Sequence, residues 1–157
     1  MRYEEILEEL QKTLDELREE SRASPVIVEG EKDLRALRAI DVAGEIITVN
    51  RGVSIFAFCE QISRRHKSVI LMTDWDSRGG TLCRRIQEGL EANGAKPNLE
   101  FRQKIAVLCM KDVKDVEGLP NYIRTLERWT REQGMEGARR RTAESLRRAK
   151  SSRNRRA

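Results

Sequence analysis

The chain has 157 residues, of which 38% are hydrophobic and 36% charged, and it carries a formal net charge of +5. This length and composition suit one domain with short, heavily charged extensions. No apolar run reaches the roughly 18–20 residues that a bilayer-spanning helix needs, and the acidic N-terminus does not have the apolar stretch of a secretory signal. Three scattered cysteines and a single histidine argue against a zinc site or a disulfide framework, so we expect a protein of the reducing cytoplasm without a membrane span.

The charge is unevenly distributed along the chain. Residues 1–24 hold 4 basic and 8 acidic residues, residues 25–120 are nearly neutral, and residues 121–157 hold 12 basic and 4 acidic residues. We therefore expect three parts: an N-terminal amphipathic helix in 1–24, a central domain over 25–120, and a C-terminal helix with an arginine-rich tail in 121–157. A basic tail of this kind suits an anionic partner, most commonly nucleic acid.

The first segment is predicted to form a helix over residues 2–21. Its apolar residues recur at alternating spacings of four and three, which places them on one face of a helix. These residues are Tyr3, Leu7, Leu10, Leu14 and Leu17. We expect this seam to pack on the rest of the chain. The alternative is that it meets a partner helix, for instance in a homodimer formed through the N-terminal helix.

The central segment alternates apolar, β-branched runs with helical patterns. The predicted strands cover residues 25–28, 46–49, 68–73 and 104–108. The predicted helices follow Gly30, span 53–65, run from Gly79 to Asn93, and lie near 120–132. Strands that alternate with helices of this length indicate right-handed crossovers and a parallel sheet, so the fold class is α/β. The tail is predicted to be helical over 138–150 and disordered over 151–157.

Acidic residues follow two of the predicted strands. Glu29 comes directly after the first strand, and Asp74 and Asp76 come directly after the third. Parallel α/β sheets bind ligands beyond the carboxyl ends of their strands, so we expect these side chains at one rim. Residues two apart can face the same side, and carboxylate oxygens are the ligands that Mg²⁺ takes. Asp112, after the predicted fourth strand, is a further candidate metal ligand; the structural alternative for Asp74 and Asp76 is helix capping.

Two of these strand ends carry motifs that resemble a known family. Residues 26–33 read Val-Ile-Val-Glu-Gly-Glu-Lys-Asp, and residues 71–80 read Leu-Met-Thr-Asp-Trp-Asp-Ser-Arg-Gly-Gly. They resemble, in order, the Glu-Gly and Asp-x-Asp motifs of the Toprim domain, over about residues 25–115. The resemblance implies a Toprim, Rossmann-like four-stranded parallel sheet flanked by helices. To this fold the chain adds an N-terminal helix and a basic C-terminal helical tail.

The same resemblance implies roles for the acids. Glu29 matches the family's general acid/base glutamate, and Asp74 and Asp76 match its metal-binding aspartates. The three would form a catalytic and metal site for Mg²⁺, with Mn²⁺ as the alternative ion. The chain is most similar to small stand-alone Toprim proteins, and through them to the maturation nuclease for 5S ribosomal RNA and to primase-type Toprim domains.

Basic residues are the candidates for contacts with nucleic acid. Arg51 and Arg78 lie next to the proposed rim, and Arg84 lies in the helix that follows it. The tail arginines with the same predicted role are Arg139, Arg140, Arg141, Arg147 and Arg148. Several arginines that neutralise phosphates make binding strongly salt-dependent. Trp75, between the two aspartates, is open to two interpretations: it stacks on a base, or it covers the sheet edge.

Three functions agree with these patterns. The first is Mg²⁺-dependent phosphoryl transfer by a nuclease that acts on structured RNA. We favour RNA over DNA because the members that the chain most resembles act on RNA, and because the tail is similar to ribosome-binding arginine-rich segments. The second is a non-catalytic Toprim factor that binds RNA or the ribosome. The third is a small primase-like protein.

Overall fold

A four-stranded parallel sheet forms the centre of the structure, a computed structural model that describes residues 2–156. The strands are β1 (Val26–Val28), β2 (Ile46–Thr48), β3 (Ser68–Leu71) and β4 (Lys96–Asn98), in the order β2-β1-β3-β4. β1 pairs with β2 on one side and with β3 on the other. All three residues of β1 are buried, as expected for a central strand with helices on both faces.

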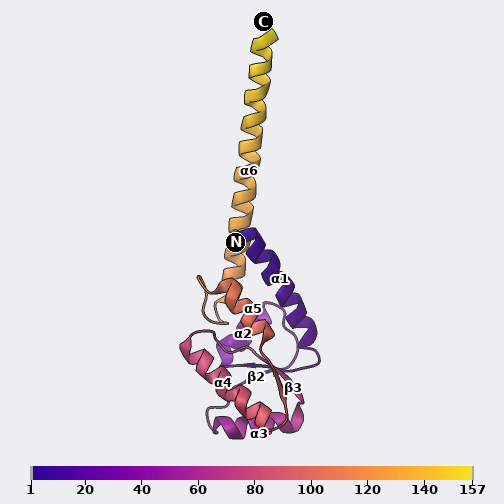
Figure 1. Cartoon of the computed structure of the whole chain (residues 1–157), viewed down its shortest axis with the longest axis vertical. Helices are drawn as coiled ribbons and strands as arrows, with labels where there is room; N and C mark the ends of the chain where they lie inside the picture. Colours follow the sequence, from indigo (N-terminus) through magenta and orange to yellow (C-terminus); the bar gives the residue numbers. More distant parts are fainter. Residues whose placement is uncertain (1, 157) are drawn as a thin grey trace.

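Helices cover both faces of the sheet (Figure 1). They are α1 (Tyr3–Glu20), α2 (Glu31–Ala39), α3 (Ile55–Arg65), α4 (Ser77–Ala92), α5 (Glu100–Cys109) and α6 (Leu119–Arg156). Alternate residues of β1 point to opposite faces. Val26 and Val28 share a core with α1, α2, α5 and the start of α6, whereas Ile27 shares a core with α3 and α4. The predicted α/β fold with a four-stranded parallel sheet is confirmed.

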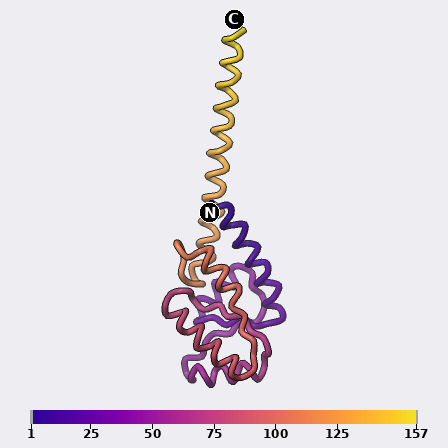
Figure 2. The backbone as a smooth tube through the Cα atoms, in the orientation of Figure 1, coloured from indigo at the N-terminus to yellow at the C-terminus, as the bar shows by residue number. Residues whose placement is uncertain are grey.

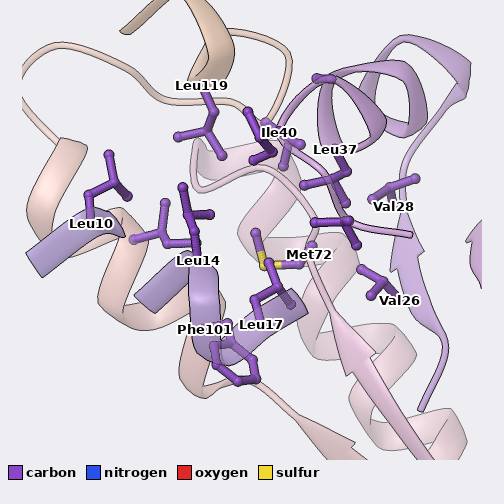
Figure 3. Packing of buried hydrophobic residues seen from close by; sticks show 14 of the residues in the cluster. Leu10, Leu14, Leu17, Val26, Val28, Leu37, Ile40, Met72, Phe101 and Leu119 are labelled. Carbon is purple, nitrogen blue, oxygen red and sulfur yellow. The ribbon is translucent and has the colours of Figure 1, made fainter. Parts of the chain in front are cut away.

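The last three leucines of the apolar seam of α1 are buried within the chain itself, whereas Tyr3 is exposed. Leu10, Leu14 and Leu17 are at most 1% exposed and pack in the first of these cores, where Figure 3 shows Leu17 next to Met72 and Phe101. The helix lies against α5 and α6. The prediction that the seam packs on the rest of the chain is therefore confirmed, and α1 shares a core with the central domain.

The predicted fourth strand over residues 104–108 is wrong, because this segment lies in helix α5. Its apolar residues follow helical spacing: Phe101, Ile105 and Cys109 are buried, whereas Val107 is 69% exposed. A strand covered on both faces would have buried every residue of the run. The true fourth strand, β4, is a short edge strand that contains Pro97, and a proline without an N–H is tolerated at a sheet edge.

The C-terminal prediction also needs correction, because α6 is one continuous helix. The structure joins the two helices predicted near 120–132 and over 138–150, and the helix continues through residues 151–156, where disorder was predicted; Ala157 lies outside the described residues. Residues 138–156 are exposed on every side and extend away from the domain (Figures 1 and 2). Ion pairs one helical turn apart support the exposed part, as between Arg140 and Glu136 at 2.8 Å.

None of the helices within residues 2–156 is both long enough and apolar enough to cross a membrane.

Candidate functional site at the acidic edge of the sheet

The candidate site lies at the carboxyl ends of β1 and β3, which are neighbours in the sheet. After β1 the chain passes to β2 on one side, and the next strand, β3, lies on the other side of β1. Such a topological switch point is where open α/β sheets bind ligands. Glu29 follows β1, and Asp74 lies in the loop between β3 and α4. The backbone N–H of Asp74 donates to Glu29 Oε1 at 3.2 Å, so the structure brings these two predicted residues together.

The carboxyl group of Asp74 is held in a partly buried position. Its Oδ1 accepts a hydrogen bond from the backbone N–H of Val116 at 2.9 Å. The pKa of Asp74 is raised to about 7, chiefly by burial and also by the negative charges of Asp33, Glu29 and Asp115, against the lowering effect of the Val116 hydrogen bond. Asp74 therefore exchanges a proton near neutral pH when no cation is bound.

Glu29 is subject to the same kinds of influence. Burial is the largest cause that raises its pKa, and the hydrogen bond from Asp74 lowers it. The charges of Asp33 and Asp76 also raise the pKa of Glu29, whereas the guanidinium of Arg51 lowers it. Glu29 therefore lies within electrostatic reach of both Asp76 and Arg51.

Asp76 caps the start of α4. Its Oδ1 accepts from the backbone N–H of Gly79 at 2.7 Å, so the capping alternative is realised for this residue. A Cβ at position 79 would overlap the carbonyl oxygen of Asp74, so only glycine fits here. The cap thus fixes the loop that carries both aspartates.

The donor chemistry at this edge fits Mg²⁺, but the acids do not form a closed cage. Within residues 2–156, no three or more His, Cys, Asp or Glu side chains are grouped closely enough to hold a metal ion. Mg²⁺ commonly binds through one or two carboxylates and completes its shell with water and substrate phosphate. The charges of Asp33 and Asp76 raise the pKa of Glu29, and the charge of Glu29 raises the pKa of Asp74, so a bound cation would relieve this repulsion. The arrangement therefore suits an ion that substrate helps to hold.

Asp112 forms a hydrogen bond with a residue of α6. It lies in the turn after α5, where its Oδ2 accepts from the hydroxyl of Tyr122 at 2.8 Å. Burial and this hydrogen bond raise the pKa of Tyr122. Because residues 104–108 are helical, Asp112 does not follow a strand end, which was the reason to expect it beside the other acids.

Trp75 covers the edge of the core. Its indole Nε1 donates to the carbonyl oxygen of Val113 at 2.7 Å, and its backbone N–H donates to the carbonyl oxygen of Lys114 at 3.1 Å. The half-buried ring packs against the core beneath α6. Of the two interpretations, the structure favours the covering role. The two hydrogen bonds of Trp75 also connect the loop that carries Asp74 and Asp76 to the segment that leads into α6.

Arg102 is a residue at this site that the sequence did not reveal. From α5 its Nε donates to the carbonyl oxygen and Oγ1 of Thr73, at 2.9 and 3.1 Å, and its Nη2 donates to the carbonyl oxygen of Asp74 at 2.7 Å. It therefore clamps the backbone that positions Asp74. No spacing motif links residue 102 to residue 74, and the mistaken strand over 104–108 concealed the helix that carries it.

The predicted nucleic-acid-binding arginines fall into two groups. Arg51 and Arg78 line the same hollow as Glu29. Arg84 is exposed on α4. The second group lies on the exposed part of α6 and comprises Arg139, Arg140, Arg141, Arg147 and Arg148.

Comparison with known proteins supports the family suggested by the motifs. Residues 24–107 match the Toprim domain, a domain of nucleic-acid-processing proteins that generally binds divalent ions such as Mg²⁺. A solved structure of a protein from Aquifex aeolicus aligns with a TM-score of 0.58 and 23% identity, covering 68% of this chain and 94% of that one. At this identity the likeness concerns the fold alone.

Relatives of similar length also exist in archaea. A UPF0292 protein of Methanosarcina barkeri is 36% identical over 125 residues, which cover 79% of this chain and 87% of the relative. A UPF0292 protein of Pyrococcus horikoshii is 33% identical over 135 residues, which cover 85% of this chain and 99% of the relative. The chain therefore belongs to the Toprim domain family and, within it, to the UPF0292 proteins.

Proposed function

We propose that the protein is a Mg²⁺-dependent nuclease that acts on structured RNA. The observation that carries the proposal is the hydrogen bond between the Asp74 backbone and the Glu29 carboxylate at the switch point of the sheet. It joins two acids at the position where α/β sheets bind their ligands, and both acids have raised pKa values. Acids in such a position are suited to proton transfer and to metal binding at neutral pH.

The side chains divide the work between them. One or two of the carboxylates of Glu29, Asp74 and Asp76 would hold Mg²⁺ together with substrate phosphate, and the bound ion would supply charge neutralisation at the scissile phosphate. Glu29 would move a proton to or from the attacking water or the leaving oxygen, a role that its raised pKa suits. Arg102 keeps the Asp74 backbone in place through its hydrogen bond to the carbonyl oxygen of Asp74.

The basic part of α6 supports RNA as the substrate. Residues 138–156 are exposed and carry a large excess of arginine and lysine over acids. Arginine-rich segments bind structured RNA through its phosphates, and ribosomal RNA offers many such structures. The helix would anchor the substrate, and the acidic edge would act on it.

A paired substitution tests the proposal. Glu29→Gln removes the proton-transferring group but nearly keeps its size, and Glu31→Gln is the matched control because Glu31 is exposed in the first turn of α2. We expect Mg²⁺-dependent cleavage of structured RNA by the parent and by Glu31→Gln. Glu29→Gln should bind the same RNA and leave it uncleaved. Equal cleavage by Glu29→Gln, or cleavage that persists in EDTA, would contradict the assignment.

A second function is a non-catalytic factor that binds RNA or the ribosome. It is favoured by the absence of a three-ligand metal group in the part of the chain that the structure describes, residues 2–156. Under this function RNA recovered with the protein from cells stays bound in EDTA and is not cut, and removal of residues 138–157 abolishes binding. Under the nuclease proposal the truncated protein keeps Mg²⁺-dependent cleavage of short substrates.

A further inference from the structure

A hollow of about 360 Å³ opens beside Glu29, between the loop that follows β2 and the start of α4. Its volume lies at the lower end of the range of about 300–1,000 Å³ found for small-molecule sites. Glu29 is part of its lining, so whatever occupies the hollow lies next to the acidic edge.

The lining combines two opposite kinds of side chain. Arg51 and Arg78 are exposed and contribute positive charge. Val53, Ile55 and Leu82 contribute half-buried apolar surface that is backed by the core beneath α3 and α4. Phosphate alone would contact the guanidinium groups but would leave the apolar wall uncovered. An apolar ligand would cover that wall but would leave the two guanidinium groups without an anionic partner. A nucleotide has both a phosphate and a flat, largely apolar base.

The loop that carries Arg51 is ordered by its own hydrogen bonds. Asn50 Oδ1 accepts from the backbone N–H of Gly52 at 2.8 Å, on the two sides of Arg51. Ser54 then caps α3 by accepting from the backbone N–H of Ala57 at 3.0 Å. The start of α4, with Arg78, is fixed by the Asp76 cap. Both sides of the hollow are therefore formed before a ligand arrives, which lowers the cost of binding.

We propose that the hollow binds one unstacked nucleotide of a nucleic-acid chain, with its phosphate at Arg51 and Arg78 and its base against Val53, Ile55 and Leu82. This inference rests on the proposed function and narrows its substrate. A base that is paired and stacked in a duplex cannot enter, so the substrate offers an unpaired nucleotide, as in a bulge, a loop or a single-stranded end. The nucleotide so held lies beside Glu29.

The test measures binding to the full chain in EDTA, so that it does not depend on cleavage. The probes are inorganic phosphate, adenosine monophosphate, adenosine triphosphate, a single-stranded trinucleotide and a blunt duplex, each titrated by calorimetry. We expect the monophosphate to bind about tenfold more tightly than phosphate, because the base adds apolar contact. The trinucleotide should bind more tightly than either adenosine nucleotide, and a short blunt duplex should not compete with it.

Substitutions in the hollow locate the binding. Arg51→Ala and Arg78→Ala should each weaken monophosphate binding about tenfold, the effect of losing one charge-assisted phosphate contact. Arg22→Ala is the matched control, because Arg22 is an exposed arginine outside the hollow whose ion pair with Glu19 is 3.6 Å long. Val53→Asp should abolish base-dependent binding; its thermal unfolding shows whether it folds, and if it does not, the arginine variants decide.

The outcomes separate this inference from the proposed function. Equal affinity for phosphate and monophosphate, or unchanged binding in both arginine variants, overturns the nucleotide site even if Glu29→Gln abolishes cleavage. Tighter binding of the triphosphate than of the trinucleotide overturns the assignment to a nucleic-acid chain and assigns the hollow to a free nucleotide. Nucleotide binding with the expected losses supports the site even if no RNA is cleaved.

Discussion

The backbone N–H of Asp74 donates to the Glu29 carboxylate at 3.2 Å, so a single hydrogen bond joins the ends of two neighbouring strands. The same proximity places two partly buried carboxyl groups within electrostatic reach, and the charge of Glu29 is one of the causes that raise the pKa of Asp74. Repulsion between Glu29 and Asp74 therefore lowers the stability of the folded protein when both groups are ionised. That loss of stability can be measured.

Stability should fall as the pH rises through the range in which Asp74 ionises. Its pKa is raised from 3.8 to about 7 in the folded protein. Protonation of Asp74 therefore stabilises the folded protein fully at a pH below 3.8, the pKa of the unfolded state. This stabilisation is lost as the pH rises through about 7, the pKa in the folded protein. In the absence of divalent ions, we compare the thermal unfolding midpoints of Asp74→Asn and the parent at about pH 5 and about pH 8. We expect the difference to change in favour of Asp74→Asn as the pH rises, because only the parent loses the protonation of residue 74.

Asp41→Asn is the control for this comparison. Asp41 is exposed and has a left-handed backbone with φ 68°, a conformation that Asn adopts as readily as Asp. The difference in thermal stability between Asp41→Asn and the parent should be the same at both pH values. A pH-independent difference between the parent and Asp74→Asn would contradict the raised pKa.

Mg²⁺ should reverse the pH dependence of stability. Metal binding requires ionised carboxylates, so Mg²⁺ stabilises the ionised form of Asp74, which burial disfavours. We expect added Mg²⁺ to raise the thermal unfolding midpoint of the parent more at about pH 8 than at about pH 5. Asp74→Asn and Asp76→Asn should lose most of this increase, whereas the exposed control Asp41→Asn should keep it. An undiminished increase in both site variants would place the ion elsewhere.

Glu29 and Asp74 could be placed near each other from the sequence because the relevant signals are local. The runs around β1 and β3 are short, apolar and β-branched, and each is followed at once by an acid, so strand type and strand end can be located together. The rule for parallel sheets then places Glu29 and Asp74 side by side, as the 3.2 Å hydrogen bond shows.

The errors arise where a decision depends on tertiary context. Ile105 to Leu108 form an apolar run too short to separate a strand from a buried helix, and only the exposed Val107 reveals the helix. The clamp from Arg102 to the Asp74 backbone depends on that helix, so it could not be predicted either. Residues 151–156 of α6 were predicted to be disordered because a highly charged segment without a buried face reads as disordered.

Replacing Arg102 should lower both the stability of the protein and the effect of Mg²⁺ on it, although residue 102 is far from Asp74 in the sequence. Arg102→Lys keeps the charge but cannot reproduce the planar fork that reaches both Thr73 and Asp74. We expect the free energy of unfolding to fall by roughly 1.5–3 kcal/mol, the contribution of hydrogen bonds made by a charged group. The Mg²⁺-dependent increase in the unfolding midpoint should also shrink.

Lys104→Met on the same helix is the control for Arg102→Lys. Lys104 forms an exposed ion pair with Glu16 at 3.7 Å, so its loss should cost at most about 1 kcal/mol. The Mg²⁺ effect should stay intact in this variant. A full Mg²⁺ effect in Arg102→Lys would show that the clamp only stabilises the fold.

A pair of glycines separates damage to the site from damage to the fold. A Cβ at position 79 would overlap the Asp74 carbonyl oxygen, and a Cβ at position 44 would overlap the Ser21 carbonyl oxygen. Gly79→Ala and Gly44→Ala should therefore each lower the free energy of unfolding by roughly 1–3 kcal/mol or more. Only Gly79→Ala should also weaken the Mg²⁺ effect, because it displaces the Asp74 backbone. Equal Mg²⁺ responses in the two variants would argue against an aspartate loop that holds the ion.

The exposed part of α6 should supply salt-dependent affinity without contributing to stability. We expect Arg139→Gln, Arg141→Gln and Arg147→Gln together to leave the unfolding midpoint unchanged, because residues 138–156 lie away from the core. The slope of log affinity for RNA against log salt should fall by about 2–3, since each phosphate contact contributes about 0.7–0.9.

The matched control for the tail is the triple change Arg64→Gln, Arg65→Gln and Lys67→Gln. It removes as much charge from the end of α3 and the residues that follow it, and α3 lies at the other end of the molecule from the exposed part of α6 (Figure 1). Its salt slope should stay close to that of the parent, because an anchor at α6 depends on where the charge lies as well as on how much there is. Equal losses in the two triple variants would mean that net charge alone attracts the RNA, and the role of α6 as an anchor would have to be abandoned.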